Sequence, residues 1–364
     1  MPRAPQLPGL TSLRGIAALC VVVHNYAVFW FPDTSAHFPG SFIVKSYLWV
    51  DMFFLLSGFV LCHVYQREFA VSVRGADYRR FMLARFARIY PLHLFTLGLL
   101  VALELVALQL WGGSGRRQPD MLVVNLLLLQ VLPTYTYWNE PAWSISAEWL
   151  TYLWIPLLMA VLSRMRDYQH LITAILCLLV LVVIEQVKGS LGAFYSGWPL
   201  LLCCEAEAIL GAILYQAGQR HAARAHRLKA ATNPLFIATI VSLCLPIPHT
   251  ISVALFALLL LAVSRFEDGD RHWLLHPTWV WLGTISYSVY LLHDPLKQLI
   301  SEVYAWLVGA PLTASLGLGE QWLVMSALIA LNVALSHVCY RFVEVTARRA
   351  LNRSRLAKRL LRIT

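Results

Sequence analysis

Charged residues are scarce in this sequence, and their scarcity excludes the commonest class of protein. Asp, Glu, Lys and Arg make up 13% of the 364 residues, whereas a soluble domain carries about 25%. Hydrophobic residues make up 59%, and the mean hydropathy is +0.64. A water-soluble fold cannot bury that much apolar surface, so we expect a membrane protein.

The sequence also lacks a disulfide framework and a metal-binding cysteine pattern. Its seven cysteines lie in or beside apolar runs, without paired loop positions and without the spacing of metal ligands. We therefore expect no structural disulfide, no structural zinc and no metal cofactor. Internal repeats, low-complexity tracts and a second domain are missing as well. The first apolar run has no small-residue cleavage pattern, so we expect it to remain as a membrane span.

Long apolar runs dominate what the sequence does contain. A membrane-spanning helix needs about 20 mostly apolar residues to cross roughly 30 Å of hydrocarbon. The runs predict an all-α, polytopic membrane protein with about ten transmembrane helices. They cover residues 8–31, 46–66, 89–111, 143–163, 170–187, 198–217, 233–247, 250–264, 279–298 and 321–343. The segment 121–132 is too short to cross as a helix, so we predict a re-entrant or surface segment there.

The basic residues predict the orientation of these helices. If both termini are cytoplasmic, 24 of the 29 lysines and arginines face the cytoplasm, as the positive-inside rule requires. If the segment 121–132 also crossed, the later arginine clusters would face outward. Topology therefore explains the net charge of +10, and we expect no nucleic acid partner. The basic residues predicted to lie outside are Lys45, Arg116, Arg117, Lys188 and Lys297.

We expect residues 1–347 to form one membrane domain and residues 348–364 to form a basic cytoplasmic tail. In the tail, basic residues alternate with Leu351, Leu356 and Leu360. This pattern is typical of a short amphipathic helix on anionic lipid. A solvated basic tail is an equal alternative.

Ionisable side chains within predicted spans mark candidate functional positions, because each costs about 2.5–3.5 kcal/mol on insertion scales. Four of them are predicted at similar depth in the outer half of the membrane: His24, Asp51, Glu148 and His293. They are expected to face one cavity. A histidine beside a carboxylate can act as a general base on a hydroxyl group, because imidazole titrates near neutral pH. Pairing of these groups to hold helices together is the structural alternative.

Two arginines on the predicted cytoplasmic side form an RxxR pattern. Arg85 and Arg88 are three residues apart, so on a helix they share a face and could hold a diphosphate. Cytoplasmic loops are rich in arginine in any case, so the pattern alone does not distinguish a binding site from topology.

Six segments of the sequence resemble the acyltransferase 3 family of membrane O-acyltransferases, in the order in which the family has them. The segments are LTSLRGIAALCVVVHNY (10–26), VDMFFLLSGFVL (50–61), RFMLARFARIYPLHLFTL (80–97), PAWSISAEWLTY (141–152), LGTISYSVYLLHDPL (282–296) and YRFVE (340–344). The resemblance implies an enzyme of the bacterial inner membrane. It implies transfer of an acyl group, expected to be acetyl, from cytoplasmic acyl-CoA to a hydroxyl of a sugar or glycosylated acceptor.

The resemblance also implies roles for the basic residues. Arg14 and His24 match the essential pair on the first span, with His24 nearest the chemistry. Arg85 and Arg88 match the arginines that bind the phosphates of acyl-CoA.

Further roles are implied for residues of the later segments. Glu148 matches the glutamate of the WSxSxE segment. Trp143 and Ser144 stand beside it and are expected to contact substrate, as is His293 of the late YLLH segment.

The spacing in the first span departs from the family pattern. Ten residues usually separate the arginine and the histidine, whereas nine separate Arg14 and His24, and Asn25 stands where the histidine is expected. A step of eleven residues returns to within about 20° of the same helix face, whereas a step of ten lies about 80° away. We therefore expect either a local distortion of the helix or a differently built cavity.

These residues suggest a mechanism and leave a main rival function, with a structural or sensory membrane protein ranked last. Acyl-CoA would bind at the inner face, and His24 would remove the proton of the acceptor hydroxyl, with Glu148 or Asp51 orienting the imidazole. A covalent acyl-enzyme is an open alternative. A proton-coupled transporter or flippase is the rival, because intramembrane His, Glu and Arg also mark proton paths. The lack of a repeat between the two halves and the arginine cluster favour the acyltransferase. The expected partners are acyl-CoA, a sugar or glycan, and membrane lipid.

Overall fold

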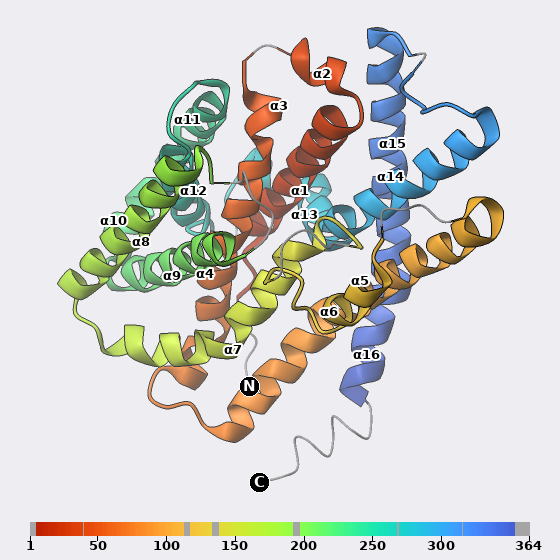
Figure 1. The fold of residues 1–364 in the computed structure, drawn as a ribbon. Coiled ribbons are helices and arrows are strands. Elements are labelled where there is room, and N and C mark those ends of the chain that lie inside the picture. Colours follow the sequence, from red (N-terminus) through yellow and green to blue (C-terminus); the bar gives the residue numbers. More distant parts are fainter. Residues whose placement is uncertain are drawn as a thin grey trace.

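The computed structural model describes residues 5–38, 40–112, 117–132, 138–191, 197–267, 269–314 and 316–353. Within these ranges the chain is built from helices and connecting turns, without β-strands (Figure 1). The prediction of an all-α fold is therefore confirmed. Most of the predicted basic tail, residues 354–364, lies outside the described residues.

Seven helical stretches among the described residues are long and apolar enough to cross a membrane. They match seven of the ten predicted runs. They are α1 (Pro8–Phe29), α3 to α4 (Phe42–Lys45 and Trp49–Phe69, joined by η1, Ser46–Leu48), α5 (Gly75–Trp111), α7 (Ala142–Arg164), α8 (Asp167–Lys188), α9 (Trp198–Arg220) and α15 (Leu318–Cys339). The last of these continues through the π-helical segment η5 (Tyr340–Val345) into α16 (Thr346–Arg353).

The other three predicted runs form shorter or divided helices. The runs 233–247 and 250–264 correspond to α11 (Thr232–Cys244) and α12 (His249–Val263), which pack against each other. The run 279–298 is divided between α13 (Pro277–Thr284) and α14 (Ser286–Val308). The count of about ten spans and the side on which each terminus lies therefore stay predictions.

The segment 121–132 forms no spanning helix, in agreement with its predicted shortness. It contains the end of η2 (Pro119–Met121) and the five-residue helix α6 (Leu122–Leu126). Its second half packs into the protein: Ser146 Oγ donates to Leu128 O at 2.7 Å, and Gln130 Nε2 donates to Ala142 O at 2.8 Å. The segment thereby supports the beginning of α7.

Close contacts between small residues hold the central helices together. A Cβ atom added at Gly283 of α13 would lie 1.7 Å from Thr11 O of α1, and one added at Gly58 of α4 would lie 1.9 Å from Ala208 O of α9. Small residues allow such close backbone approach between membrane helices. The first contact fixes the part of α1 that carries Arg14.

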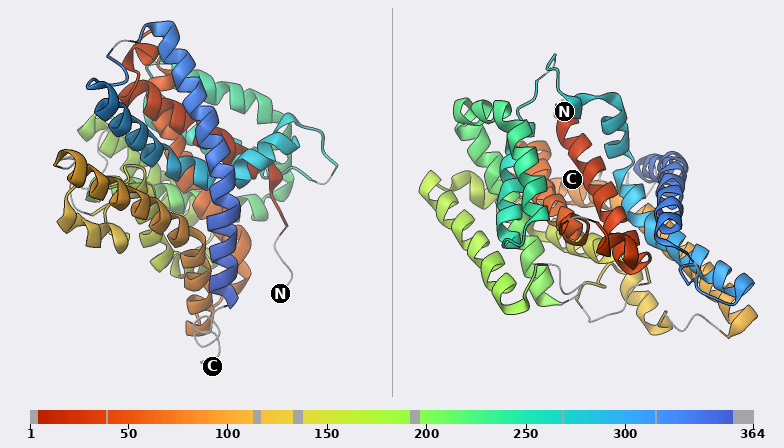
Figure 2. Two further views of the ribbon diagram at one scale, coloured as in Figure 1. Left: turned by 90° about the vertical axis from the view of Figure 1, so that its right-hand side faces the viewer. Right: turned by 90° about the horizontal axis from the view of Figure 1, so that it is seen from above.

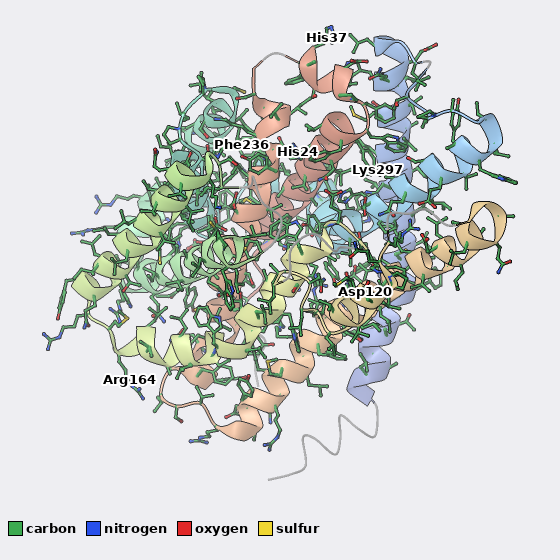
Figure 3. The ribbon with its side chains drawn as sticks, viewed as in Figure 1. His24, His37, Asp120, Arg164, Phe236 and Lys297 are labelled. Atoms are coloured by element: carbon green, nitrogen blue, oxygen red, sulfur yellow. The ribbon has the colours of Figure 1, made fainter. Side chains whose placement is uncertain are left out.

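The helices surround a central region that holds the polar residues. Figure 2 shows α15 at one edge of the bundle, where it packs against α14. In Figure 3, His37 lies at the end of the molecule that carries α2 (Pro32–Ala36), Arg164 lies toward the opposite end, and His24 lies between them. The candidate site lies in this interior.

Candidate active site

Two neighbouring cavities lie inside the helical bundle. The first, here called the arginine cavity, has a volume of about 160 Å³ and contains Arg14, Arg85, Arg88 and Glu148. The second, here called the histidine cavity, has a volume of about 40 Å³. Its ionisable residues are His24, Asp51 and Glu140.

The structure distributes the four predicted intramembrane groups over three places instead of one cavity. His24 and Asp51 line the histidine cavity, together with Trp143. Glu148 lines the arginine cavity. His293 lines neither cavity, since it is packed between α14 and α1.

Tyr290 and Val50 line both cavities and so form the wall between them. The Tyr290 hydroxyl lies 2.8 Å from Ser144 Oγ and donates to Pro141 O at 3.1 Å. Ser144 lines the arginine cavity, whereas Pro141 lines the histidine cavity. These bonds fix the tyrosine across the boundary.

His24 is buried on α1, with 3% of its surface exposed. Its Nδ1 lies 2.9 Å from the carbonyl oxygen of Ile43, so Nδ1 carries the proton and donates. Its Nε2 has no hydrogen-bond partner among the described residues. A neutral imidazole in this tautomer has an unpaired lone pair on Nε2, and an unpaired lone pair is what a general base requires.

No carboxylate of the described residues orients His24, contrary to the hypothesis that Glu148 or Asp51 does so. Glu148 accepts hydrogen bonds from Tyr152 and, at 3.3 Å, from Ser57 Oγ. Asp51 interacts with the carboxyl group of Glu207 on α9. The main-chain carbonyl of Ile43 does the orienting instead.

Arg14 points into the arginine cavity from α1. It forms no hydrogen bond or ion pair with another described residue. The nearest charges that act on it are those of Arg88, Glu148 and Glu344. Its guanidinium group is therefore available to an anion or a polar ligand in that cavity.

Arg85 and Arg88 both line the arginine cavity, as their spacing on a helix predicts. Arg85 donates to Tyr65 Oη at 2.9 Å and stacks over the same ring at 5.2 Å. Arg88 forms an ion pair with the buried Glu344, at 3.2 Å. Ser288 Oγ donates to the other oxygen of Glu344.

Glu344 is a site residue whose role the sequence analysis did not identify. It lies in η5, where the helix widens into π-helical turns. Such turns are frequent at functional sites. A glutamate within the arginine-rich C-terminal region was a signal that a buried ion pair forms there.

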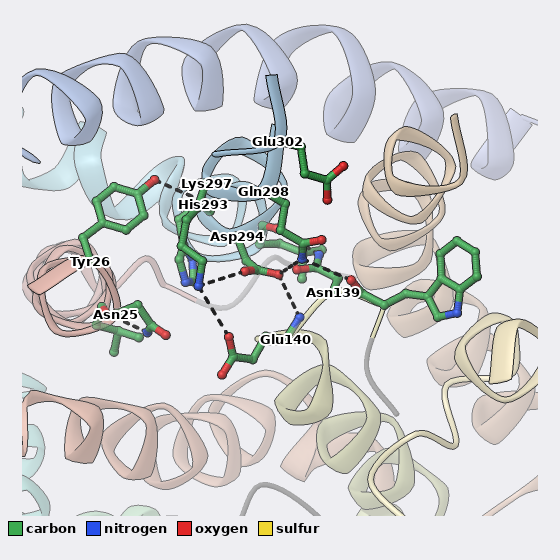
Figure 4. A network of polar contacts seen from close by, with 12 residues as sticks. Asn25, Tyr26, Asn139, Glu140, His293, Asp294, Lys297, Gln298 and Glu302 are labelled. Atoms are coloured by element: carbon green, nitrogen blue, oxygen red, sulfur yellow. Dashed lines mark hydrogen bonds and ion pairs between the residues drawn. The ribbon is translucent and has the colours of Figure 1, made fainter. Parts of the chain in front are cut away.

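A charged cluster beside the histidine cavity was also missed (Figure 4). The Glu140 main-chain nitrogen donates to Asp294 Oδ2 at 3.0 Å. Lys297 Nζ lies 3.4 Å from Asp294 Oδ1 and 3.7 Å from Glu140 Oε2. Burial and the charge of Asp294 raise the pKa of Glu140, and Lys297 acts in the opposite direction. Asp294 falls within the predicted span 279–298, and Lys297 stands at its predicted outer end, so the charge of Asp294 was a usable signal.

His293 supports this cluster from within α14. Its Nδ1 lies 2.5 Å from Tyr290 O, and its own carbonyl accepts a hydrogen bond from Tyr26 Oη at 3.1 Å. The residue therefore connects α14 to α1. Among the described residues, no group of three or more His, Cys, Asp or Glu could hold a metal ion.

Sequence comparisons place this chain among known proteins. The profile of the acyltransferase 3 family, described as "Acyltransferase domain", matches residues 7–341. "Acyltransferase MdmB" of Streptomyces mycarofaciens is 40% identical over 165 residues, which are 43% of this chain and 40% of that protein. "Protein 2 in picA locus" of Rhizobium radiobacter is 41% identical over 154 residues, which are 38% of this chain and 75% of that protein. The chain thus spans less than half the length of the first of these relatives. No solved structure matches it.

Proposed function

Because the chain belongs to the acyltransferase 3 family, we propose that this acyltransferase moves an acyl group, expected to be acetyl, from acyl-CoA to a hydroxyl of a sugar or glycosylated acceptor. It would act in the bacterial inner membrane, with the donor on the cytoplasmic side. The observation that carries the proposal is the pair of adjoining cavities, one rich in arginine and one lined by a histidine whose Nε2 has no hydrogen-bond partner among the described residues.

The arginine cavity is the proposed donor site. The phosphates of CoA are anionic, and arginine binds phosphate oxygens through paired hydrogen bonds. Arg85 supplies a guanidinium group held in place by Tyr65, and Arg14 supplies one without a described partner. Arg88 is held by Glu344, so its role would be to shape the cavity and add positive charge.

His24 is the proposed base. The acceptor hydroxyl would lose its proton to Nε2 while its oxygen attacks the thioester carbonyl. The carbon–sulfur bond then breaks, and the CoA sulfur takes up a proton as the ester forms. The Nδ1 proton of His24 is held in the hydrogen bond to the Ile43 carbonyl oxygen. Nε2 therefore carries no proton and can take up the proton of the acceptor hydroxyl.

The other residues would position the substrates. Trp143 and Asp51 line the histidine cavity and would contact the acceptor. Ser144 and Glu148 line the arginine cavity and would contact the thioester end of the donor.

Purified protein incubated with radiolabelled acetyl-CoA and a membrane extract tests the proposal. His24→Ala is expected to lower acyl transfer roughly 10²- to 10⁴-fold, the range for loss of a general base. His37→Ala, at the exposed end of α2, is the matched control and should leave the rate unchanged. Undiminished transfer by His24→Ala would refute the role of His24. A transporter or flippase, the rival function, would release no free CoA.

A further inference from the structure

The histidine cavity contains a second group with open hydrogen-bonding capacity. The Glu140 carboxylate has Lys297 as its one cationic partner among the described residues, with Lys297 Nζ 3.7 Å from Oε2, so most of its acceptor sites are unused. A carboxylate offers about four acceptor sites. Glu140 and His24 line the same small cavity from different elements. Glu140 lies in the turn that precedes α7, and His24 lies on α1.

Three successive residues, Asn139 to Pro141, hydrogen-bond to α14, Asn139 through its side chain and the other two through the main chain. Pro295 lacks an N–H group, so within α14 the carbonyl of Leu291 has no helical partner. Asn139 Nδ2 donates to that carbonyl at 3.0 Å. Glu140 N donates to Asp294, and Pro141 O accepts from Tyr290.

The charges of the cluster favour a ligand that donates hydrogen bonds. Two carboxylates, Glu140 and Asp294, face one ammonium group, that of Lys297 (Figure 4). Asp294 also accepts from Gln298 Nε2 at 2.7 Å, so its oxygens are occupied. The remaining acceptor capacity lies on Glu140 and is directed to the cavity that it lines.

We propose that Glu140 binds the acceptor by accepting a hydrogen bond from a hydroxyl adjacent to the one that His24 deprotonates. The acceptor class is then a vicinal diol, as found in sugars and other polyols, with one hydroxyl on Nε2 of His24 and its neighbour on Glu140. The histidine cavity is small, about 40 Å³, so the diol edge is the part of such a molecule that would contact His24 and Glu140. This inference rests on the proposed acyl transfer at His24.

Two small alcohols that differ by one hydroxyl test the inference. Full-length protein receives acetyl-CoA and either cis-cyclohexane-1,2-diol or cyclohexanol, and mass spectrometry measures the ester. The wild type should acylate the diol roughly 10-fold faster or more, the value of one hydrogen bond to a charged group. Glu140→Ala should bring the two rates close together, and Glu140→Gln, of the same shape, should retain part of the preference.

The ratio of the two rates controls for poorly folded protein, because a lower active fraction affects both alcohols equally. Asp120→Asn, an exposed acid in η2, should keep the wild-type ratio. Equal rates in the wild type, no ester from either alcohol, or an unchanged ratio in Glu140→Ala would each overturn the inference. If His24-dependent transfer to membrane extract persists in those cases, the proposed function stands. If His24-dependent transfer to membrane extract is also missing, the proposed function fails as well.

Discussion

At the scale of single residues, Arg85 and Arg14 are the groups best placed to recognise phosphate. Arg85 is held by a hydrogen bond and a ring contact to Tyr65, so little conformational freedom is lost when an anion binds. Arg88, by contrast, is neutralised by a buried carboxylate. The two arginines of one sequence motif therefore have different electrostatic surroundings.

Arg85→Ala is expected to raise the KM for acetyl-CoA roughly 10-fold or more, because a charge-assisted contact to phosphate is lost. The KM for acetyl-pantetheine, which lacks the phosphates of CoA, should change little. Arg80→Ala is the control on the same helix, since Arg80 is exposed. Equal effects on both donors would show that Arg85 does not act on phosphate.

The sequence predicted His24, Arg14, Arg85 and Arg88 but not their orientation. α1 runs without interruption from Pro8 to Phe29, so no break in the helix lies between Arg14 and His24. The two residues face separate cavities. The sequence could not predict that Ile43 O orients His24, because every residue type has a main-chain carbonyl and no pattern of residue types marks this one.

At the scale of helices, contacts between glycine and backbone decide how closely α1 approaches α13. Gly283 meets Thr11 O, and Gly15 meets Gly283 N, at distances that leave no room for a side chain. Arg14 lies between Thr11 and Gly15 on this stretch of α1. Packing here therefore sets where the arginine enters its cavity.

Gly283→Ala should cost roughly 1 to 3 kcal/mol of folding free energy, because the added methyl group forces α13 away from α1. Denaturant unfolding of the purified protein in detergent measures it. Gly98→Ala is the matched control, because nothing lies within 4 Å of the added atom in α5. It should be neutral or stabilising by about 0.5 to 1 kcal/mol. Similar destabilisation by both would contradict the packing argument.

Hydrophobic run length predicted the long helices well and the short ones poorly. Apolar runs of about 20 residues became single helices, as in α1 and α9. The run 279–298 contains a break at Ile285 that hydropathy does not register, because the residues on both sides are apolar. Helix breaks of this kind depend on contacts with neighbouring helices.

At the scale of the whole molecule, Val50 and Tyr290 form the wall between the proposed donor cavity and the proposed acceptor cavity. Tyr290 supplies most of the polar anchoring of that wall through Ser144 and Pro141. No local sequence pattern could have revealed the wall, because Val50, Pro141, Ser144 and Tyr290 come from three distant segments. The sequence supplied the catalytic candidates, whereas only the fold shows that they belong to two compartments.

Tyr290→Ala is expected to raise the release of CoA from acetyl-CoA several-fold when no acceptor is present. Under the proposed function the acyl group passes beside this ring, so removal of the ring would let water reach the thioester carbonyl as well and release CoA. Tyr290→Phe keeps the ring and should stay close to the wild type. Thiol titration of released CoA measures the effect. The same rate for all three proteins would mean that the ring does not shield the donor.

The presence of two adjoining cavities has a consequence for the order of events. If donor and acceptor occupy the two cavities as proposed, both can be bound at once when the acyl group moves, and neither has to leave before the other arrives. Spent CoA would then compete with fresh acyl-CoA for the arginines while leaving the hydroxyl-binding side unobstructed.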